Sequence, residues 1–434
     1  MRRYLLLAML CCTAVVHAQR TIIYCGKIVD VKSAKMLTEM SILVDSGKIT
    51  DVQKGYIASN STDKIIDLKN KTVMPGLIDC HVHLEFETKP NAMLDQFRLN
   101  PADIALQSIG YAEKTLMAGF TTVRDVGGSG VNISLRNAIN KGLVNGPRIY
   151  TAGKIISSTG GHGDPTTGLN DEFRGNPGIV EGVANGVDEC IKAVRERYKE
   201  GSDLIKITAS GGVLSLEKDG TGAQYSIDEI KTIVQTARDY GMKVAAHAHG
   251  AEAMKRAILA GVASIEHGTY MNDEDIALCK QYGTYFVPTI IAGKSVADSA
   301  KKPGYYPPLI ASKALAIGPV IQNTFAKAYK EGVKIAFGTD AGVYAHGKNW
   351  MEFVYMNEAG MPALDAIKAA TSNAADLIGI ANETGSIEKG KWADIIAVDG
   401  DPTQDIHVMG KVSFVMKDGR VYKLPIELFR KVTI

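Results

Sequence analysis

The hydrophobic pattern divides the chain into three parts, of which the first and the last share one texture. From about Thr21 to Thr72, short runs rich in β-branched residues alternate with turn residues, and the segment from 393 to 423 has the same pattern. The clearest predicted strands are 21–25, 41–45, 48–52, 393–398, 412–416 and 421–423. We therefore expect β-structure at both ends of the chain.

The middle of the chain has a different texture, in which short apolar runs alternate with stretches of helical periodicity. The clearest helical stretches are 186–198, 227–240 and 251–259. Eight predicted strands lie at 77–79, 121–123, 148–150, 204–207, 244–246, 264–266, 285–287 and 335–337. Eight strand–helix units predict a closed parallel (β/α)8 barrel. An open doubly wound sheet is the alternative, but no G-x-G-x-x-G turn opens a helix after the first of these strands.

These patterns predict an α/β protein with two folded parts. A TIM barrel would occupy residues 75–384, and the two β-rich ends, 19–74 and 385–434, would join as one small discontinuous β-sandwich domain. The chain of 434 residues suits this division, because a barrel takes about 250 residues and leaves enough chain for an accessory domain.

The first 18 residues have the pattern of a cleavable signal peptide. Arg2 and Arg3 form a basic start, an apolar run extends from Tyr4 to Val16, and cleavage is expected after Ala18. A short membrane anchor is the alternative, but the apolar run falls short of the roughly 20 residues that span a bilayer. We therefore expect a periplasmic or secreted protein that has no membrane association after cleavage.

Charge and cysteine content narrow the range of partners. Without the two signal-segment arginines, 47 basic residues balance 47 acidic ones, which gives no sign of a nucleic-acid or anionic-surface partner. The cysteines beyond the signal segment are Cys25, Cys80, Cys190 and Cys279. Their wide spacing favours buried thiols over the one disulfide that an oxidising compartment would permit. A homo-oligomer is expected only because symmetric assemblies are common among soluble enzymes.

Polar residues recur where the predicted barrel strands end, the position at which barrel enzymes hold their active sites. His81 and His83 follow the first strand and, as residues i and i+2 of an extended segment, face the same side. His247, His267 and Asp340 follow the fifth, sixth and eighth strands. Each of them alone is typical of a loop or core residue. Together, imidazole and carboxylate groups at one end of a barrel suit zinc or a similar divalent ion.

Two further residues leave alternatives open. Lys206 lies within the fourth predicted strand, between two isoleucines, where a buried ammonium group needs a partner or must lose its charge. An ion pair with a nearby carboxylate is the simplest solution. His249 lies two residues after His247 in the same stretch, so two histidines stand at the end of the fifth strand.

The stretches that carry these residues resemble the amidohydrolase superfamily in its binuclear form, and most of all its prolidase-like dipeptidases and carboxypeptidase-type members. The matching stretches, in the family's order, are PGLIDCHVHL, GFTTVRDVGG, SSTGGHGD, LIKITASGG, VAAHAHG, SIEHGT, FGTDAG, TSNAADLIG and KGKWADIIAVDGDP. They are spread over nearly the whole chain beyond the signal segment, so the resemblance is far more specific than any single motif.

The resemblance implies two divalent metal ions, most simply Zn²⁺, at the mouth of the barrel. The implied ligands are His81, His83, Lys206, His247, His267 and Asp340. Lys206 would be carboxylated by carbon dioxide and bridge the two ions as a carbamate, which would also resolve its unfavourable burial. His247 is preferred over His249 because it stands at the end of its strand, as in the family's pattern.

The resemblance also implies the reaction and two substrate contacts. Asp340 would take a proton from the attacking water, made nucleophilic by the metals, and pass it to the leaving nitrogen. His162, in the glycine-rich stretch 158–164, would polarise the carbonyl oxygen of the substrate, unless it only stabilises its loop. Tyr225 would contact the substrate carboxylate, although a tyrosine beside a helix N-cap such as Ser226 often simply packs.

The expected activity is hydrolysis of an amide bond to a C-terminal amino acid in a small amide or dipeptide. The enzyme would be a dipeptidase, such as one that cleaves Xaa-Pro, or an N-acyl-amino-acid hydrolase. On the same metal site, a cyclic-amide or lactone hydrolase of imidazolone or hydantoin type, or a hydrolase of aromatic mycotoxin amides, is the alternative. A non-catalytic scaffold is disfavoured, because every metal-ligand position of the family is filled.

Overall fold

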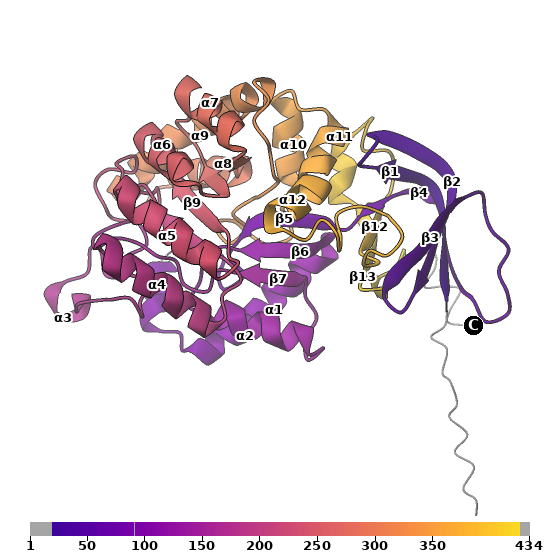
Figure 1. Cartoon of the computed structure of the whole chain (residues 1–434), viewed down its shortest axis with the longest axis horizontal. Coiled ribbons are helices and arrows are strands. Elements are labelled where there is room, and N and C mark those ends of the chain that lie inside the picture. The colour runs from indigo at the N-terminus through magenta and orange to yellow at the C-terminus, as the bar shows by residue number, and fades with distance from the viewer. Residues whose placement is uncertain (1–19, 91, 426–434) are drawn as a thin grey trace, which may run out of the picture.

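The computed structural model describes residues 20–90 and 92–425. It places a barrel surrounded by helices beside a smaller β domain at one end of the molecule (Figure 1). The predicted signal peptide and its cleavage after Ala18 lie outside the described residues. None of the described helices combines the length and the apolar character that a bilayer crossing requires.

The two ends of the chain build one seven-stranded sheet. Its strands are β1 (Thr21–Asp30), β2 (Lys35–Asp45), β3 (Lys48–Lys54), β4 (Lys64–Pro75), β12 (Ile395–Val398), β13 (Val412–Lys417) and β14 (Arg420–Lys423). Their order is β14–β13–β12–β4–β1–β2–β3, so the C-terminal strands pair directly with the N-terminal ones through β12 and β4. A β-bridge between Lys48 of the edge strand β3 and Trp392, which precedes β12, brings β3 close to the start of β12. The two ends of the chain therefore form one discontinuous β domain, as a single seven-stranded sheet rather than the two packed sheets of the predicted β-sandwich.

The interior of this sheet is filled from both ends of the chain. Ile23 and Ile42 from the N-terminal segment share one buried cluster with Ile395 and Phe414 from the C-terminal segment. An apolar sheet face must be covered by another element. Neither terminal segment covers the apolar face of its own strands, so the two segments pack together and bury these faces jointly.

The barrel strands form two parallel sheets, with the orders β5–β6–β7 and β8–β9–β10–β11. The strands are β5 (Leu77–Val82), β6 (Phe120–Asp125), β7 (Arg148–Thr151), β8 (Ile205–Thr208), β9 (Val244–Ala248), β10 (Ser264–His267) and β11 (Tyr285–Val287). Single parallel bridges connect the sheets at Ile156–Ile207, Phe286–Ile335 and Val82–Ala341. The eighth predicted strand, 335–337, is therefore present only as an irregular segment that joins β11 to β5.

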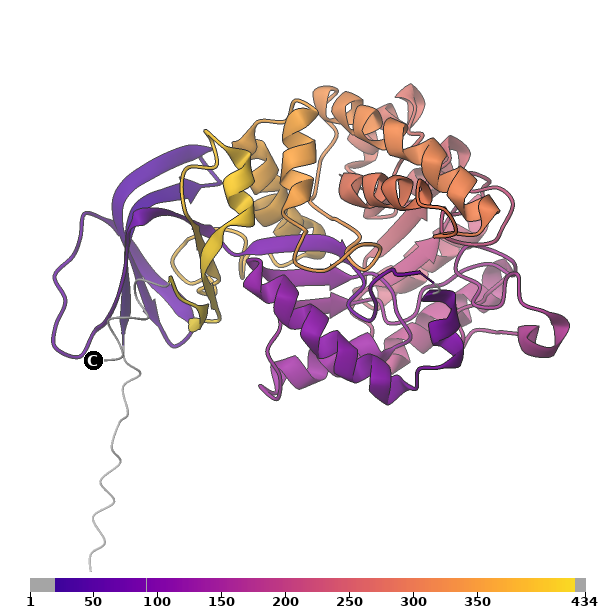
Figure 2. The same cartoon turned by 180° about the vertical axis from the view of Figure 1, so that it is seen from behind.

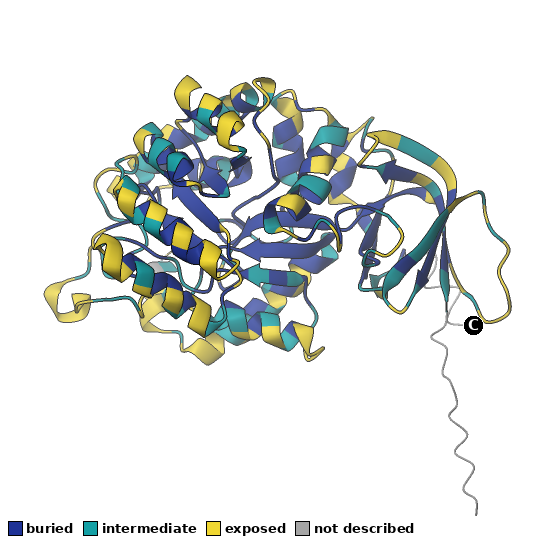
Figure 3. Cartoon of the chain, in the orientation of Figure 1, coloured by how far each residue is buried: buried dark blue, intermediate teal, exposed yellow. Residues whose placement is uncertain are grey.

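Helices cover the outside of the strands, with buried inner faces and exposed outer faces (Figure 3). They are α1 (Pro101–Met117), α2 (Val131–Asn140), α3 (Asp171–Arg174), α4 (Gly186–Glu200), α5 (Ile227–Asp239), α6 (Ala251–Ala260), α7 (Asp273–Tyr282), α10 (Met351–Glu358), α11 (Ala363–Lys368) and α12 (Ala374–Ile378), with short turns η1 (Ala92–Phe97), η2 (Ala369–Asn373) and η3 (Ile406–Gly410). The three helices predicted from periodicity, α4 to α6, are confirmed. In α5, Ile230, Ile233 and Ala237 are buried at the helical spacing, and Ser226 and Glu229 form a capping box at its start.

The segment after β11 forms a helical hairpin instead of a single helix. α8 (Ile290–Ala300) and α9 (Pro308–Lys330) pack against each other and are joined by the turn 301–307 (Figure 2, orange). Gly293 of α8 permits this close approach, because a Cβ atom there would lie 2.9 Å from Cγ2 of Ile321. The hairpin was not predicted from the sequence, and it forms one side of the cavity described next.

Candidate active site

A cavity of about 410 Å³ opens at the carboxyl ends of the barrel strands. One side of it is apolar and is formed largely by α8 and α9. The polar lining residues are His81, His83, His162, Lys206, Thr208, His247, His249, His267, Thr289 and Asp340. The structure therefore brings all six predicted metal ligands, and His162 with them, around a single cavity.

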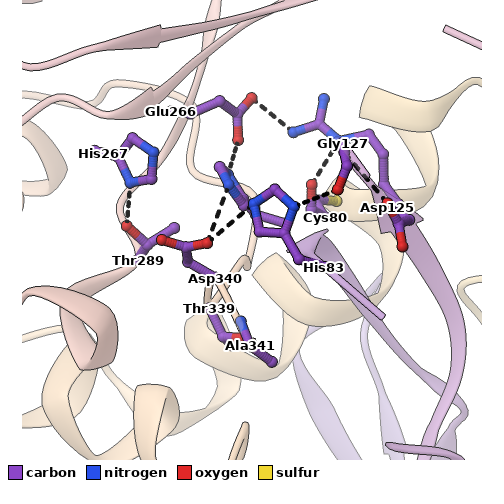
Figure 4. Close-up of polar contacts among 12 residues, drawn as sticks. Cys80, His83, Asp125, Gly127, Glu266, His267, Thr289, Thr339, Asp340 and Ala341 are labelled. Carbon is purple, nitrogen blue, oxygen red and sulfur yellow. Dashed lines mark hydrogen bonds and ion pairs between the residues drawn. The ribbon is translucent and has the colours of Figure 1, made fainter. Parts of the chain in front are cut away.

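Asp340 lies against both histidines of the first barrel strand (Figure 4). Its Oδ1 atom is 3.5 Å from Nε2 of His81 and 3.2 Å from Nε2 of His83. Among the described residues, Nε2 of His81 and Oδ1 of Asp340 are buried and have no hydrogen-bond partner. The ligand atom of His267 lies within 4.8 Å of theirs. Buried polar atoms normally have partners. Unpartnered imidazole and carboxylate atoms that converge in this way fit a divalent cation.

The second ring nitrogen of each of these histidines is held by a hydrogen bond. The Nδ1 contacts are His81 to Oε2 of Glu266 at 2.8 Å, His83 to the Gly127 carbonyl at 2.6 Å, and His267 to Oγ1 of Thr289 at 2.8 Å. Contacts of this kind fix the tautomer and orient Nε2 toward a metal. Burial lowers the pKa of His81 and His267 well below the usual range, which keeps the rings neutral and their lone pairs free.

Three of the cavity residues have a left-handed backbone conformation that is uncommon for residues other than glycine. The φ angles are +69° at His267, +52° at Thr289 and +61° at Asp340. Successive side chains of a regular strand point to opposite faces. The turn at His267 therefore explains how both Glu266 and His267 reach the same cluster (Figure 4). Such conformations persist where the surrounding structure holds them, and they gather at functional sites.

Lys206 lies in β8, lines the same cavity as the histidines and is 4% exposed. Its ammonium group makes no hydrogen bond and no ion pair within 4 Å among the described residues, so the ion-pair alternative is not realised. Burial lowers the pKa of Lys206 to about 8. At this pKa about a tenth of the amine is free at pH 7, and a free amine can act as a nucleophile.

His247 and His249 both line the cavity, with ring centroids 4.7 Å apart. Nε2 of His247 contacts the Gly211 carbonyl at 3.0 Å, and Nδ1 of His249 contacts Oγ1 of Thr269 at 2.8 Å. The His247 ring lies closer to the His267 ring, at 4.6 Å against 5.2 Å for His249. The preference for His247 as the ligand stays a prediction.

His162 lies in the cavity, as predicted, beside the histidines of the strand ends. Its ring centroid is 4.3 Å from that of His247, and its Nδ1 atom is 2.6 Å from Oγ of Ser215. Gly212 makes this position possible, because a Cβ atom there would lie 2.1 Å from Cε1 of the His162 ring.

Tyr225 does not line the cavity. Its side chain is 1% exposed within the main hydrophobic core, and its hydroxyl donates to the Ala184 carbonyl at 2.9 Å. The predicted contact between Tyr225 and the substrate carboxylate is therefore wrong. Ser226 caps α5 on the outside of the barrel, and Tyr225 packs where that helix begins. The alternative of simple packing holds.

Sequence reasoning missed the buried acid that supports His81. Glu266 accepts from Nη2 of Arg124 at 2.7 Å through Oε1 and contacts His81 at 2.8 Å through Oε2 (Figure 4). The signal was an acidic residue inside a predicted barrel strand, directly before a strand-end histidine. All four cysteines beyond the signal segment are buried and free, so no disulfide forms among them.

Imidazole, lysine and carboxylate groups line a cavity at the carboxyl ends of the parallel strands. This is where barrel enzymes hold their active sites. Residues 72–422 match the model of the Amidohydrolase family. The chain is 32% identical to "Ochratoxinase" of Aspergillus niger, over 94% of this chain and 88% of that protein. A solved structure of a Xaa-Pro dipeptidase with methionine bound in its active site is 51% identical in sequence to this chain. The two structures match with a TM-score of 0.91, over 93% of this chain and all of the other. The structure of a prolidase in complex with N-methylphosphonate-L-proline is 31% identical in sequence to this chain. It matches with a TM-score of 0.85, over 93% of this chain and all of the other.

The chain belongs to the amidohydrolase family, and the predicted resemblance is confirmed. The protein is a hydrolase that acts on carbon–nitrogen bonds, and its prolidase-like relatives place it in the predicted branch.

Proposed function

We propose that the protein hydrolyses the amide bond to a C-terminal amino acid, in a dipeptide or an N-acyl amino acid. The observation that carries this proposal is the convergence of unpartnered buried atoms of His81 and Asp340 at one cavity, with His267 within reach. The likeness to a Xaa-Pro dipeptidase and to a prolidase supports an amino-acid leaving group, with proline as the favoured case.

The donor set fits two divalent metal ions, for which Zn²⁺ is the natural candidate. Two such ions, when bound, lower the pKa of water and polarise the substrate carbonyl. Our proposed ligands are His81, His83, Lys206, His247, His267 and Asp340. Lys206 would serve as a carbamate, because an unpaired and partly deprotonated amine in this position can react with carbon dioxide.

The protein side chains then divide the proton transfers and the binding of the carbonyl. Asp340 accepts a proton from the attacking water and delivers it to the leaving nitrogen. Burial, followed by the nearby Lys206, lowers the pKa of His162 to about 3, so its ring is neutral. In the tautomer in which Nδ1 accepts from the Ser215 hydroxyl, Nε2 of His162 carries the proton and can donate to the carbonyl oxygen of the substrate.

A substrate panel on the zinc-loaded protein tests this function. It contains Xaa-Pro and other dipeptides, N-acyl amino acids, cyclic amides and lactones, with products identified by mass spectrometry. We expect cleavage of linear amides that carry a free carboxylate. Turnover of cyclic amides or lactones alone would refute the proposal and favour the ring-opening alternative.

A second candidate is hydrolysis of a bulky aromatic amide. The uncharged, apolar side of the cavity favours it, as does the likeness to the ochratoxinase of Aspergillus niger. Adding aromatic amides that lack a free carboxylate, such as N-benzylbenzamide, to the panel separates the two candidates. If these compounds are cleaved at least tenfold faster than any dipeptide, the aromatic amide replaces the dipeptide as the proposed substrate.

We further propose that the protein is exported and that its first 18 residues are removed. The basic start, the apolar run and the small residue Ala18 support this. N-terminal sequencing of the protein purified from its source should begin at Gln19, and a mature protein that begins at Met1 would contradict it. A homo-oligomer is proposed on general grounds only and is tested by the mass in solution.

A further inference from the structure

The apolar side of the cavity is built by a segment that contributes no proposed metal ligand. The hairpin of α8 and α9 supplies Ala292, Gly293, Val296, Ile317 and Ile321 to the lining. These residues line the same cavity as the proposed metal ligands. The hairpin therefore adds a surface to the barrel whose character is independent of the metal ligands.

A short loop after β8 completes this apolar wall. Val213 and Leu214 line the cavity, and Val213 packs with Val296, Ala314 and Ile317 in a hydrophobic cluster separate from the main core. Because this cluster is separate, it is a packing unit that faces the cavity rather than the centre of the barrel.

Lys313 of α9 fastens the loop to the hairpin. Its ammonium group donates to three carbonyl oxygens of the segment 212–217, at distances of 2.7, 2.8 and 3.0 Å. Lys313, Ile317 and Ile321 follow one another at intervals of four residues, so they lie along one face of α9. The face that holds the loop is thus also the face that lines the cavity.

The apolar wall offers no charge to a ligand. Among the described lining residues, the charged side chains are Lys206 and Asp340, and both belong to the proposed metal centre. A charged substrate group placed against the wall would lose its water without gaining a partner.

We propose that the apolar wall is a subsite that selects substrates with a bulky apolar group beside the scissile amide, and that Ile317 limits its depth. The cavity volume of about 410 Å³ lies within the range of small-molecule sites. The charged end of the substrate stays outside this subsite, at the cavity mouth. The inference deepens the proposed function and rests on it only in placing the reacting amide at the metal centre.

Straight-chain hydroxamic acids of two to eight carbons test the subsite without requiring turnover. They bind a metal centre through the hydroxamate group and present an alkyl chain of known length. Calorimetry on the zinc-loaded protein should show a Kd that falls about fourfold for each methylene that enters the apolar wall. An analogue of equal length that ends in a carboxylate or an ammonium group should lose this gain.

Two variants and one control place the effect on the hairpin. Ile317→Ala should weaken binding of the six-carbon hydroxamate roughly tenfold and shift the preferred length to longer chains. Ala292→Leu should shift it to shorter chains. Leu315→Ala is the matched control, because Leu315 lies on the same helix and is 45% exposed. It should leave the series unchanged.

The outcomes separate the subsite from the proposed function. A Kd that does not change with chain length, or tighter binding of a charged-end analogue, overturns the subsite even if amides are hydrolysed. A clear chain-length dependence with no amide hydrolysed in the panel leaves the subsite standing and refutes the function. An equal effect of Ile317→Ala and Leu315→Ala would show that the hairpin does not contact the alkyl chain.

Discussion

The metal-centre side and the apolar wall of the cavity are built in different ways. On the metal side, ligand candidates end rigid strands, and a second residue holds each of the rings of His81, His83 and His267 by a hydrogen bond. On the wall, helices and a loop present methyl groups, and the hydrogen bonds of Lys313 hold the loop from behind. Metal chemistry needs fixed directions, whereas selection of an apolar group needs volume and the absence of charge.

α8 connects these two regions. Thr289, directly before the helix, holds the His267 ring, while the first backbone amides of α8 donate to Glu352 at 2.8 and 2.7 Å. Glu352 is fully buried on α10 and satisfies the start of the helix that continues into the apolar wall. Variants on the metal-centre side should therefore affect metal binding, and variants on the apolar wall should affect substrate selection. Variants of Glu352, at the start of α8, should affect stability.

Lys206→Ala should have the largest effect. Without the side chain that we propose as the bridge, the protein should lose metal and all measurable turnover. Metal content by mass spectrometry and the rate with an amide substrate measure this. Added short carboxylic acids should restore part of the activity, because they can occupy the space of the carbamate. A variant with normal metal content and rate would rule out the bridge.

Asp340→Asn should reduce kcat by about 10² to 10⁴, the usual contribution of a positioned acid–base group. An amide cannot accept the proton of the attacking water, although its oxygen can remain a metal ligand. Metal content and KM should change much less than kcat. A near-normal kcat in this variant would contradict the prediction, since Asp340 would then have no role in proton transfer.

Glu266→Gln should weaken metal binding by about 10 to 100-fold, the usual effect of removing an acid that supports a ligating histidine. The measurement is zinc affinity by competition with a chelator. Ser264→Ala is the matched control, because the Ser264 hydroxyl accepts from Arg124 at 3.0 Å and donates to Glu266 in the same network without touching His81. Equal losses in both variants would assign the effect to the network rather than to His81.

Glu352→Gln should change the pH dependence of stability. Burial raises the pKa of Glu352 from its ordinary value of 4.5 to about 8. The folded protein then binds this proton more tightly than the unfolded chain. The contribution of Glu352 is complete below about pH 4.5 and is lost as pH rises to about 8. The variant should flatten this part of the curve in denaturant unfolding from pH 5 to 8, and an unchanged slope would contradict the shift.

Tyr225→Phe should have the smallest effect on function. Removing a hydroxyl that donates to the Ala184 carbonyl should cost about 1 kcal/mol of unfolding free energy. KM and kcat should stay within about twofold of the parent, because the hydroxyl lies outside the cavity. A large increase in KM would restore Tyr225 as a substrate contact. Thermal unfolding and steady-state kinetics together decide between the two.

Much of the fold followed from periodicity. Seven of the eight predicted barrel strands and the helices α4 to α6 were found, because their apolar residues recur at the spacing of the element they form. The eighth strand is irregular, since its segment pairs through single bridges on each side. The hairpin of α8 and α9 escaped prediction because no local pattern says whether one helix or two will cover β11.

The candidate site was predicted where residues act through their place at a strand end, and missed where they act through a distant partner. The i, i+2 spacing by itself puts His81 and His83 on one side, and the strand pattern by itself puts Asp340 at the end of the eighth barrel segment. Only the tertiary structure joined Glu266 to His81, and Glu352 to the start of α8, across 185 and 62 residues of chain. Periodicity reports which way a side chain points from its own backbone. The partner that the side chain meets depends on packing between elements, which no local pattern encodes. Tyr225 is an example, because its position in the sequence suggested a substrate contact and the structure places it in the core.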